Sequence, residues 1–273
     1  MGVTWGPGFH AAPGQSVDSS AYEQYIGRWS RLFVPALLAG AGIGEGDRVL
    51  DVATGTGEAA QLALQQVGNT GLVVGVDISS AMLQAACARL SSRQFVPVVS
   101  DAQALVFPNA SFDAVLCQLG LMFLSDPGRG LAEFRRVLRT NRHAAVCVIS
   151  SPDRAPMWGL LAEALGRHLP DQRAELQRSF ALADVARLET LFVAAGFHDV
   201  RVTRETREAT VDSFDQYWAP IETGPGQMPQ AYRALPETGR TAVRKEVQDR
   251  ISQFELNGRL TMSVEMLIGV GRA

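Results

Sequence analysis

Basic charge, cysteine and long apolar runs are all scarce in this sequence. A single lysine, Lys245, occurs among the 25 basic residues, and the formal net charge of the 273-residue chain is −3. Because proteins that bind nucleic acid carry an excess of basic charge, no nucleic-acid partner is expected. No apolar run approaches the roughly 20 residues of a membrane span, and the N-terminus lacks the basic segment and apolar core of a secretory signal. We therefore expect a cytoplasmic protein without a membrane partner.

The cysteines are few and unpatterned. Cys87, Cys117 and Cys147 are odd in number, lie in hydrophobic segments and show no metal-ligand spacing. Cysteines of this kind are typical of buried thiols in a reducing compartment. We predict that all three are buried and that the protein has no metal site. Hydrophobic residues make up 47% of the chain, which is enough for one large core.

The most informative segment begins with a strand that breaks into a glycine-rich turn. Arg48–Val52 has the composition of a buried strand, Gly55 and Gly57 follow it, and Glu58–Val67 has the composition of a helix. Two glycines separated by one residue let the backbone approach a ligand closely, with the amides at the helix start facing it. This pattern predicts a bound cofactor.

Two acidic residues near this turn narrow the choice of cofactor. Asp77 ends the next predicted strand, where a carboxylate suits the hydroxyls of a ribose. Gly55–Ala60 also fits the G-x-G-x-x-G/A fingerprint of dinucleotide-binding proteins. However, Asp51 lies four residues before Gly55, where its charge would repel a pyrophosphate and attract a cationic amine. The methionyl part of S-adenosylmethionine carries such an amine.

The segment Asp51-Val52-Ala53-Thr54-Gly55-Thr56-Gly57 resembles the first motif of class I S-adenosylmethionine-dependent methyltransferases, whose usual form is acid-x-G-x-G-x-G. Ala53 replaces the first glycine, which a small residue can do while its φ stays negative. The resemblance implies that Asp51 holds the loop and the cofactor amine. It also places a run of turn residues against the cofactor, namely Ala53, Thr54, Gly55, Thr56 and Gly57.

Further motifs of this family follow in the expected order. Val73–Ser79 resembles the second strand with its ribose-binding acid, and implies that Ile78 and Met82 flank the adenine. Ser100-Asp101-Ala102-Gln103 resembles the turn after the third strand. There the resemblance assigns the adenine amine to Asp101 and a ring nitrogen to the amide of Ala102, with Gln103 in the same turn. Phe112–Gln118 resembles the fourth strand and implies that Gln118 contacts the methionyl amine.

An aromatic stripe precedes the first strand. Tyr22, Tyr25, Arg28 and Trp29 lie largely on one face of a predicted helix that runs from Ala21 to Ala41. Such a stripe is more often part of the core than of a binding surface. In related sequences, however, a segment of this type folds over the cofactor. The resemblance therefore makes Tyr25 and Arg28 candidate cofactor contacts, with the Arg28 guanidinium paired to the carboxylate.

The resemblance covers residues 22–205 and a last strand within 264–272, and it implies the fold. That fold is α/β and Rossmann-like, a doubly wound seven-stranded sheet, mostly parallel with an antiparallel last strand, plus a helical cap. We expect an N-terminal tail and helical lid over 1–45 and an S-adenosylmethionine-binding domain over 46–205. These are followed by a helical cap insertion over 206–262 and by the last strand over 263–273. Five residues are candidates for an apolar acceptor pocket, namely Trp158, Phe214, Tyr217, Trp218 and Met228.

No general base can be assigned from the sequence. His143 and His198 precede predicted strands, His168 ends a predicted helix, and His10 lies in the tail. The leading hypothesis is methyl transfer from S-adenosylmethionine, with S-adenosylhomocysteine as product, to oxygen, carbon or nitrogen of a small metabolite or quinone-like acceptor. The alternatives are a protein that binds S-adenosylmethionine without methyl transfer, such as a cyclase or a binding partner, and a nicotinamide-dependent oxidoreductase. The sequence also allows a homodimer.

Overall fold

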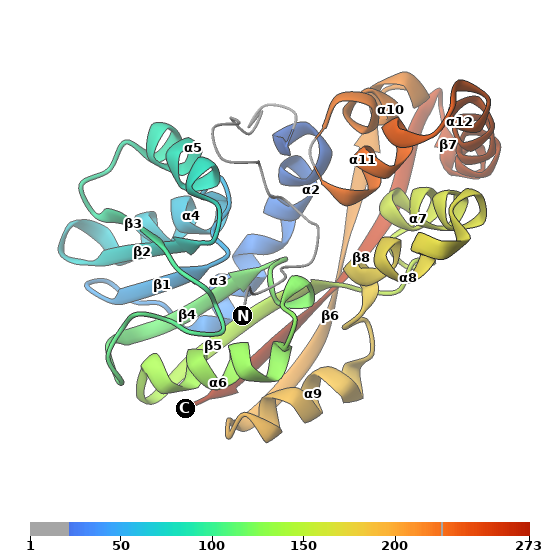
Figure 1. Ribbon diagram of the computed structural model, residues 1–273. Helices are drawn as coiled ribbons and strands as arrows, with labels where there is room; N and C mark the ends of the chain where they lie inside the picture. Colours follow the sequence, from blue (N-terminus) through green and yellow to red (C-terminus); the bar gives the residue numbers. More distant parts are fainter. Residues whose placement is uncertain (1–21, 225) are drawn as a thin grey trace.

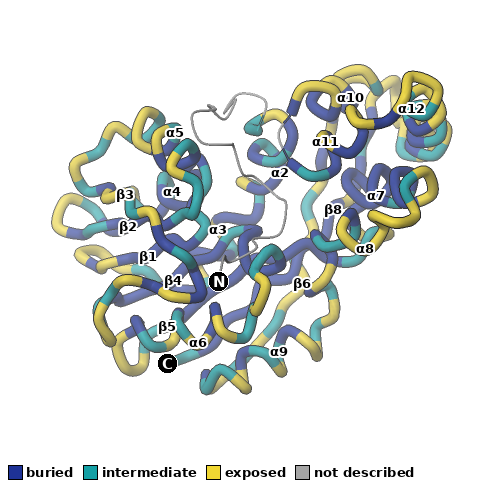
Figure 2. The backbone as a smooth tube through the Cα atoms, viewed as in Figure 1, coloured by how far each residue is buried: buried dark blue, intermediate teal, exposed yellow. Residues whose placement is uncertain are grey.

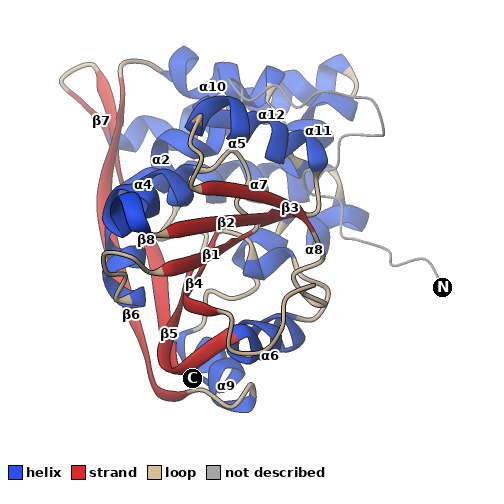
Figure 3. Cartoon of the chain, turned by 90° about the vertical axis from the view of Figure 1, so that its left-hand side faces the viewer, coloured by secondary structure: helices blue, strands red, loops and turns tan. Residues whose placement is uncertain are grey.

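One twisted sheet organises the chain in the computed structural model, which describes residues 22–224 and 226–273. Within them the strand order is β3-β2-β1-β4-β5-β8-β6, with a short β7 paired to β8 (Figures 1 and 3). The bounds are β1 (Arg48–Val52), β2 (Leu72–Asp77), β3 (Phe95–Val99), β4 (Phe112–Gln118), β5 (Leu138–Ile149), β6 (His198–Val211), β7 (Glu255–Leu256) and β8 (Arg259–Arg272). Strands β1 to β5 pair in parallel, whereas β8 is antiparallel to β5 and β6.

This topology confirms the predicted Rossmann-like fold. The two-residue β7 is an additional strand, and β6 is longer than expected. The sequence pattern places the sixth strand over 198–203, but the ladder with β8 continues to the pair Val211 and Leu260. Residues of β6 beyond Thr203 stay extended because β8 supplies hydrogen-bond partners along their whole length. Together the two strands reach past the rest of the sheet toward a group of helices (Figure 1).

Helices cover the sheet from both sides. α3 (Val34–Ala41) packs beside α4 (Glu58–Val67), and α6 (Pro127–Val137) packs beside α9 (Val185–Ala194). α5 (Ser80–Leu90) lies against β2 and β3. Local sequence sets their ends. Asp126 and Asp184 cap α6 and α9 by accepting from the amides three residues on, and Gly196 follows α9 with a left-handed φ of +88°.

A second group of helices gathers around the far end of β6 and β8 (Figure 1). It contains α7 (Pro156–His168), α8 (Arg173–Leu176), α10 (Phe214–Thr223), α11 (Gln227–Ala234) and α12 (Glu237–Ile251). Large aromatic side chains hold this group together. Trp218 stacks on Phe214 at 5.5 Å between ring centroids and meets Tyr232 edge-on at 5.2 Å. Figure 2 shows buried segments on the inner sides of these helices.

Short helical turns complete the described chain. Before the sheet, η1 (Glu23–Gly27), α2 (Arg28–Ser30) and η2 (Arg31–Phe33) lead into α3, whose first turn contains Pro35. The remaining turns are η3 (Gly68–Thr70), η4 (Leu121–Phe123), η5 (Pro170–Gln172), η6 (Arg178–Phe180) and η7 (Ser252–Phe254). The predictions for the tail over 1–20 and for His10 lie outside the described residues.

The cysteine prediction is wrong at one position. Cys117 and Cys147 are buried in β4 and β5, but Cys87 is exposed. α5 buries Met82, Leu83 and Ala86, and the next residue is turned by about 100° toward solvent because an α-helix has 3.6 residues per turn. Within the described part of the chain, no cluster of acidic, histidine or cysteine residues could hold a metal ion. No helix there is both long and apolar enough to cross a membrane.

Candidate cofactor site

The glycine turn after β1 has a left-handed backbone at three positions. φ is +56° at Ala53, +54° at Gly55 and +84° at Gly57. The expectation that Ala53 keeps a negative φ is therefore wrong. The loop after β4 approaches the turn so closely that residue 120 has no room for a side chain, because a Cβ on Gly120 would stand 2.5 Å from the Cβ of Ala53. Leu119 in that loop is also left-handed, with φ +54°. Strained residues of this kind cluster at functional sites.

The strain at Ala53 gives a test of stability. A left-handed conformation costs an L-residue about 1–2 kcal/mol, and the extra freedom of glycine when unfolded offsets roughly 0.5–1 kcal/mol of that. We expect Ala53→Gly to raise the free energy of unfolding by about 0.5–1 kcal/mol in urea titrations. Ala63→Gly, in the middle of α4, is the control and should lower it by about 1 kcal/mol. A loss of stability in Ala53→Gly would show that the methyl group packs favourably there.

Two buried oxygens at neighbouring strand ends have no hydrogen-bond partner among the described residues. Asp51, near the end of β1, accepts a 2.6 Å bond from the Thr54 hydroxyl through Oδ2, while its Oδ1 is unpaired. Gln118, the last residue of β4, donates from Nε2 to the Ser30 carbonyl at 3.0 Å, while its Oε1 is unpaired. Burial raises the pKa of Asp51 to about 7, opposed by the Thr54 hydroxyl. An ammonium group donates three hydrogen bonds and needs only acceptors to pair with it, so these two residue types fit the methionyl amine.

Asp77 is fixed by the glycine turn. Its Oδ2 accepts from the Gly55 amide at 3.0 Å and its Oδ1 from the Ser79 amide at 2.9 Å. The cap of α5 is Ser79, whose hydroxyl accepts from the Met82 amide. Asp77 is therefore not the capping residue of α5. A carboxylate at the end of β2 is the kind of acceptor that the hydroxyls of a ribose require.

The turn after β3 is braced by Gln103. Asp101 Oδ1 accepts from the Gln103 amide at 2.7 Å and from its Nε2 at 3.3 Å. The Gln103 side-chain oxygen accepts from the Ser125 hydroxyl at 2.9 Å and the Asp126 amide at 2.8 Å. Gln103 thus ties this turn to the loop before α6 and leaves Asp101 at the sheet edge that also carries Asp77. Beside it, Ala102 and Met82 are buried and Ile78 is half-buried.

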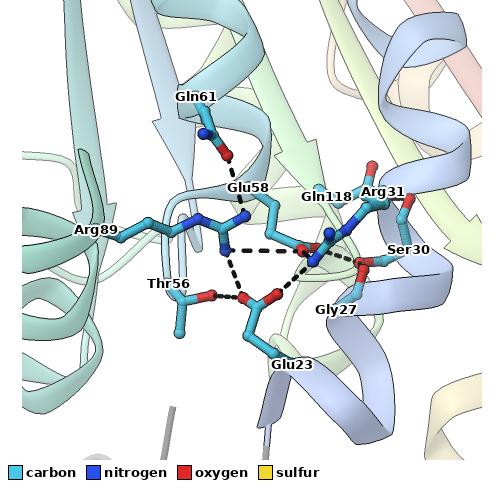
Figure 4. A network of polar contacts seen from close by, with 9 residues as sticks. All are labelled: Glu23, Gly27, Ser30, Arg31, Thr56, Glu58, Gln61, Arg89 and Gln118. Carbon is cyan, nitrogen blue, oxygen red and sulfur yellow. Dashed lines mark hydrogen bonds and ion pairs between the residues drawn. The ribbon is translucent and has the colours of Figure 1, made fainter. Parts of the chain in front are cut away.

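A cluster of charged residues joins the N-terminal segment to the glycine turn (Figure 4). Glu23 accepts from Thr56 at 2.8 Å, Arg89 at 2.5 Å and Arg31 at 2.5 Å. Glu58, the first residue of α4, accepts from Ser30 at 2.5 Å and Arg31 at 3.1 Å. The two carboxylates come so close that a Cβ on Gly27 would meet one oxygen of each within 2.9 Å.

Sequence reasoning missed Glu23, Arg31, Glu58 and Arg89. Glu23 and Arg31 are 8 residues apart, but the contacts of Glu58 with Arg31 and of Glu23 with Arg89 join positions 27 and 66 residues apart, and no local pattern marks such pairs. The only signal is the position of Glu58 directly after the turn. Burial raises the pKa of Glu58 to about 7, with the Glu23 carboxylate adding to the effect and the Ser30 hydroxyl opposing it.

Two neighbouring cavities lie above the strand ends. The first, over the glycine turn, is lined by residues that include Tyr22, Ala53, Thr56 and Gln118. The second adjoins it and is partly open to solvent. Its walls include Tyr25, Met122, Trp158 and Met228. Tyr22 and Leu119 line both cavities, so the two meet at these side chains.

The predicted acceptor-pocket and N-terminal residues are divided between these spaces and the cap. Tyr25, Trp158 and Met228 line the second cavity, and Arg28 and Tyr217 line a smaller one beside it, together with Tyr25 and Trp158. Phe214 and Trp218 pack on each other. Arg28 lies over the Trp29 ring at 4.2 Å. Tyr25 and Arg28 thus face the cap, whereas Tyr22 and Glu23 face the glycine turn.

Comparison with known proteins agrees with this arrangement. Residues 50–146 match the methyltransferase domain family. The chain is 42% identical over 126 residues to a ubiquinone/menaquinone biosynthesis C-methyltransferase of Xanthomonas campestris, covering 45% of this chain and 48% of that protein. It therefore spans about half the length of such relatives.

Solved structures share the fold. Phosphoethanolamine N-methyltransferase 2 of Haemonchus contortus, in complex with S-adenosylmethionine, has a TM-score of 0.59 at 18% identity, covering 93% of this chain and 56% of that one. The [4+2]-cyclase SpnF has a TM-score of 0.52 at 19% identity, covering 99% and 88%. The domain match over residues 50–146 and the ordered motifs make this part of the chain similar to the methyltransferase domain of the ubiquinone/menaquinone C-methyltransferases.

Proposed function

We propose that the protein transfers a methyl group from S-adenosylmethionine to a small, largely apolar molecule. The observation that carries this proposal is the pair of unpartnered buried oxygens at the ends of β1 and β4, Asp51 Oδ1 and Gln118 Oε1. Buried acceptors without donors cost free energy, and a bound amine would remove that cost. Asp77, which the Gly55 and Ser79 amides hold in place, would accept from the ribose.

The protein's part in the reaction is to bind, to align and to exclude water. S-adenosylmethionine, when bound, supplies an activated methyl group on a sulfonium sulfur. Asp51 and Gln118 would hold the amine end over the glycine turn, and Tyr22 and Leu119 stand where the first cavity meets the second. An acceptor in the second cavity would therefore approach the donor across these two side chains. Alignment of this kind can supply much of the rate enhancement.

The second cavity offers no evident general base. None of the described residues that line it is Asp, Glu, His, Lys or Arg. Burial, together with Tyr217, raises the pKa of Tyr25, so this phenol keeps its proton at neutral pH. The acceptor must then be nucleophilic by itself, as an ionised phenol or an electron-rich ring carbon is. The quinone biosynthesis named for the similar proteins fits this, and we infer a quinone-like or phenolic acceptor methylated on carbon or oxygen.

Methyl transfer is tested with labelled donor. The protein is incubated with tritiated S-adenosylmethionine and a metabolite extract, and label is followed into organic-soluble products. Calorimetric titration with S-adenosylhomocysteine and NAD runs alongside. We expect label transfer and binding of the sulfur nucleoside alone. Binding without any transfer would favour a protein that only binds S-adenosylmethionine, such as a cyclase, and tight NAD binding would favour an oxidoreductase.

Closure of the N-terminal segment gives a kinetic prediction. Glu23 bridges Thr56, Arg31 and Arg89 from the segment that covers the first cavity. Exposed ion pairs contribute up to roughly 1 kcal/mol each, so Glu23→Gln should raise the dissociation rate of S-adenosylhomocysteine about fivefold. Stopped-flow displacement measures this rate. Glu222→Gln, which breaks an ion pair with Arg244 in the cap, should leave it unchanged, and equal effects in both variants would contradict a role for Glu23 in closure.

A further inference from the structure

Two residues that line the second cavity carry a buried hydrogen-bond donor without a partner among the described residues. The hydroxyl of Tyr25 and the indole Nε1 of Trp158 are both buried and unpaired. Tyr25 is 7% exposed and Trp158 is 2% exposed. The two side chains come from different parts of the chain, η1 and α7, and both line the second cavity and the smaller one beside it. The rest of the second cavity is mainly apolar, with Leu119, Met122 and Ile149 among its walls.

In two neighbouring residues of the same types, the side-chain donors are paired. The Tyr217 hydroxyl donates to the Met157 carbonyl at 2.7 Å, and Trp218 Nε1 donates to Glu222 Oε1 at 3.1 Å. Most buried polar groups in proteins are paired in this way. An unpaired buried donor costs about 1–3 kcal/mol, and Phe would fill either position without that cost. The retention of two such donors on one apolar cavity indicates a ligand that pairs with them.

On the basis of the proposed function, we propose that Tyr25 and Trp158 select the methyl acceptor by donating hydrogen bonds to an oxygen on a planar apolar molecule. Aromatic walls such as Tyr22 and Trp158 suit a flat ring system. A site that hydrogen-bonds a substrate oxygen also rejects analogues without it. Arg28, whose Nε is likewise buried and unpaired within the described residues, lines the adjoining cavity with both donors. Its positive charge favours an oxygen that carries negative charge, such as a phenolate.

Binding of matched probes tests this selection. 2-Naphthol and 2-methylnaphthalene have nearly the same shape, but the first carries a hydroxyl where the second carries a methyl group. Equilibrium dialysis gives the affinity of each in the presence of saturating S-adenosylhomocysteine. The wild type should prefer 2-naphthol about 25-fold, since each of the two hydrogen bonds adds roughly a factor of five. Tyr25→Phe and Trp158→Phe should each reduce the preference about fivefold. The control Trp218→Phe, which removes a donor that is already paired with Glu222, should keep the preference.

Thermal unfolding supplies a second readout. Tyr25→Phe removes an unpaired donor and should raise Tm of the free protein by about 3 °C, whereas Tyr217→Phe breaks an existing hydrogen bond and should lower it. The proposal is overturned if the wild type shows no preference for 2-naphthol or if either Tyr25→Phe or Trp158→Phe retains the full preference. Calorimetry with S-adenosylhomocysteine on the wild type separates the two questions. Its failure to bind would overturn the proposed function, whatever the probes show.

Discussion

Asp77→Ala is expected to weaken the binding of S-adenosylhomocysteine about 100-fold. In the bound state the carboxylate would accept from both ribose hydroxyls, and hydrogen bonds to a charged group contribute roughly 1.5–3 kcal/mol each. Losing two of them at the low end of that range corresponds to about two orders of magnitude in Kd. The substitution also releases the Gly55 amide, which Asp77 Oδ2 holds at 3.0 Å. Isothermal titration calorimetry measures the change directly.

A matched control separates the ligand contact from the local fold. Asp184 caps α9 by accepting from the Arg187 amide at 2.7 Å, so Asp184→Ala removes a comparable backbone-holding carboxylate away from the site. It should lower stability by about 1 kcal/mol and leave the affinity for S-adenosylhomocysteine unchanged. Asp77→Asn keeps an acceptor for one amide, so its Kd for S-adenosylhomocysteine should lie between those of the wild type and Asp77→Ala. A Kd within threefold of wild type in Asp77→Ala would rule out a ribose contact.

The sequence predicts the strand ends of this site well because their signals are local. A buried strand, a glycine turn and a helix follow one another over residues 48–67, and the structure places them in that order. Parallel pairing then brings the ends of β1, β2 and β4 to one edge of the sheet, so residues that follow strands in the sequence become neighbours in space. Asp51, Asp77 and Gln118 are brought together by this rule alone.

What the sequence does not reveal depends on tertiary packing. The left-handed φ of Ala53 follows from the close approach of the loop after β4, which is 67 residues further on at Gly120. Glu23 and Glu58 come together only because the N-terminal segment folds back over the turn. The donors of Tyr25 and Trp158 are unpaired because no acceptor among the described residues packs against them. Composition cannot show which side chains pack together.

The raised pKa of Asp51 makes cofactor binding depend on pH. Burial lifts the pKa of this carboxyl from near 4 to about 7, so in the folded protein it still holds its proton at pH 6. The unfolded chain has lost that proton already above about pH 4, so the contribution of Asp51 to stability declines as the pH rises from about 4 to 7. A bound amine reverses this preference, because the ionised carboxylate attracts the ammonium.

The affinity for S-adenosylhomocysteine should therefore rise about eightfold between pH 6 and pH 7.5, in step with the ionised fraction of a group whose pKa is about 7. Asp51→Asn should bind more weakly at pH 7.5 and show a flat profile, which calorimetry at several pH values measures. Glu58 also has a pKa of about 7 but bonds to Ser30 and Arg31. Glu58→Gln should therefore keep the rise. A rise that persists in Asp51→Asn and disappears in Glu58→Gln would transfer the effect from the amine contact to the closure of the N-terminal segment.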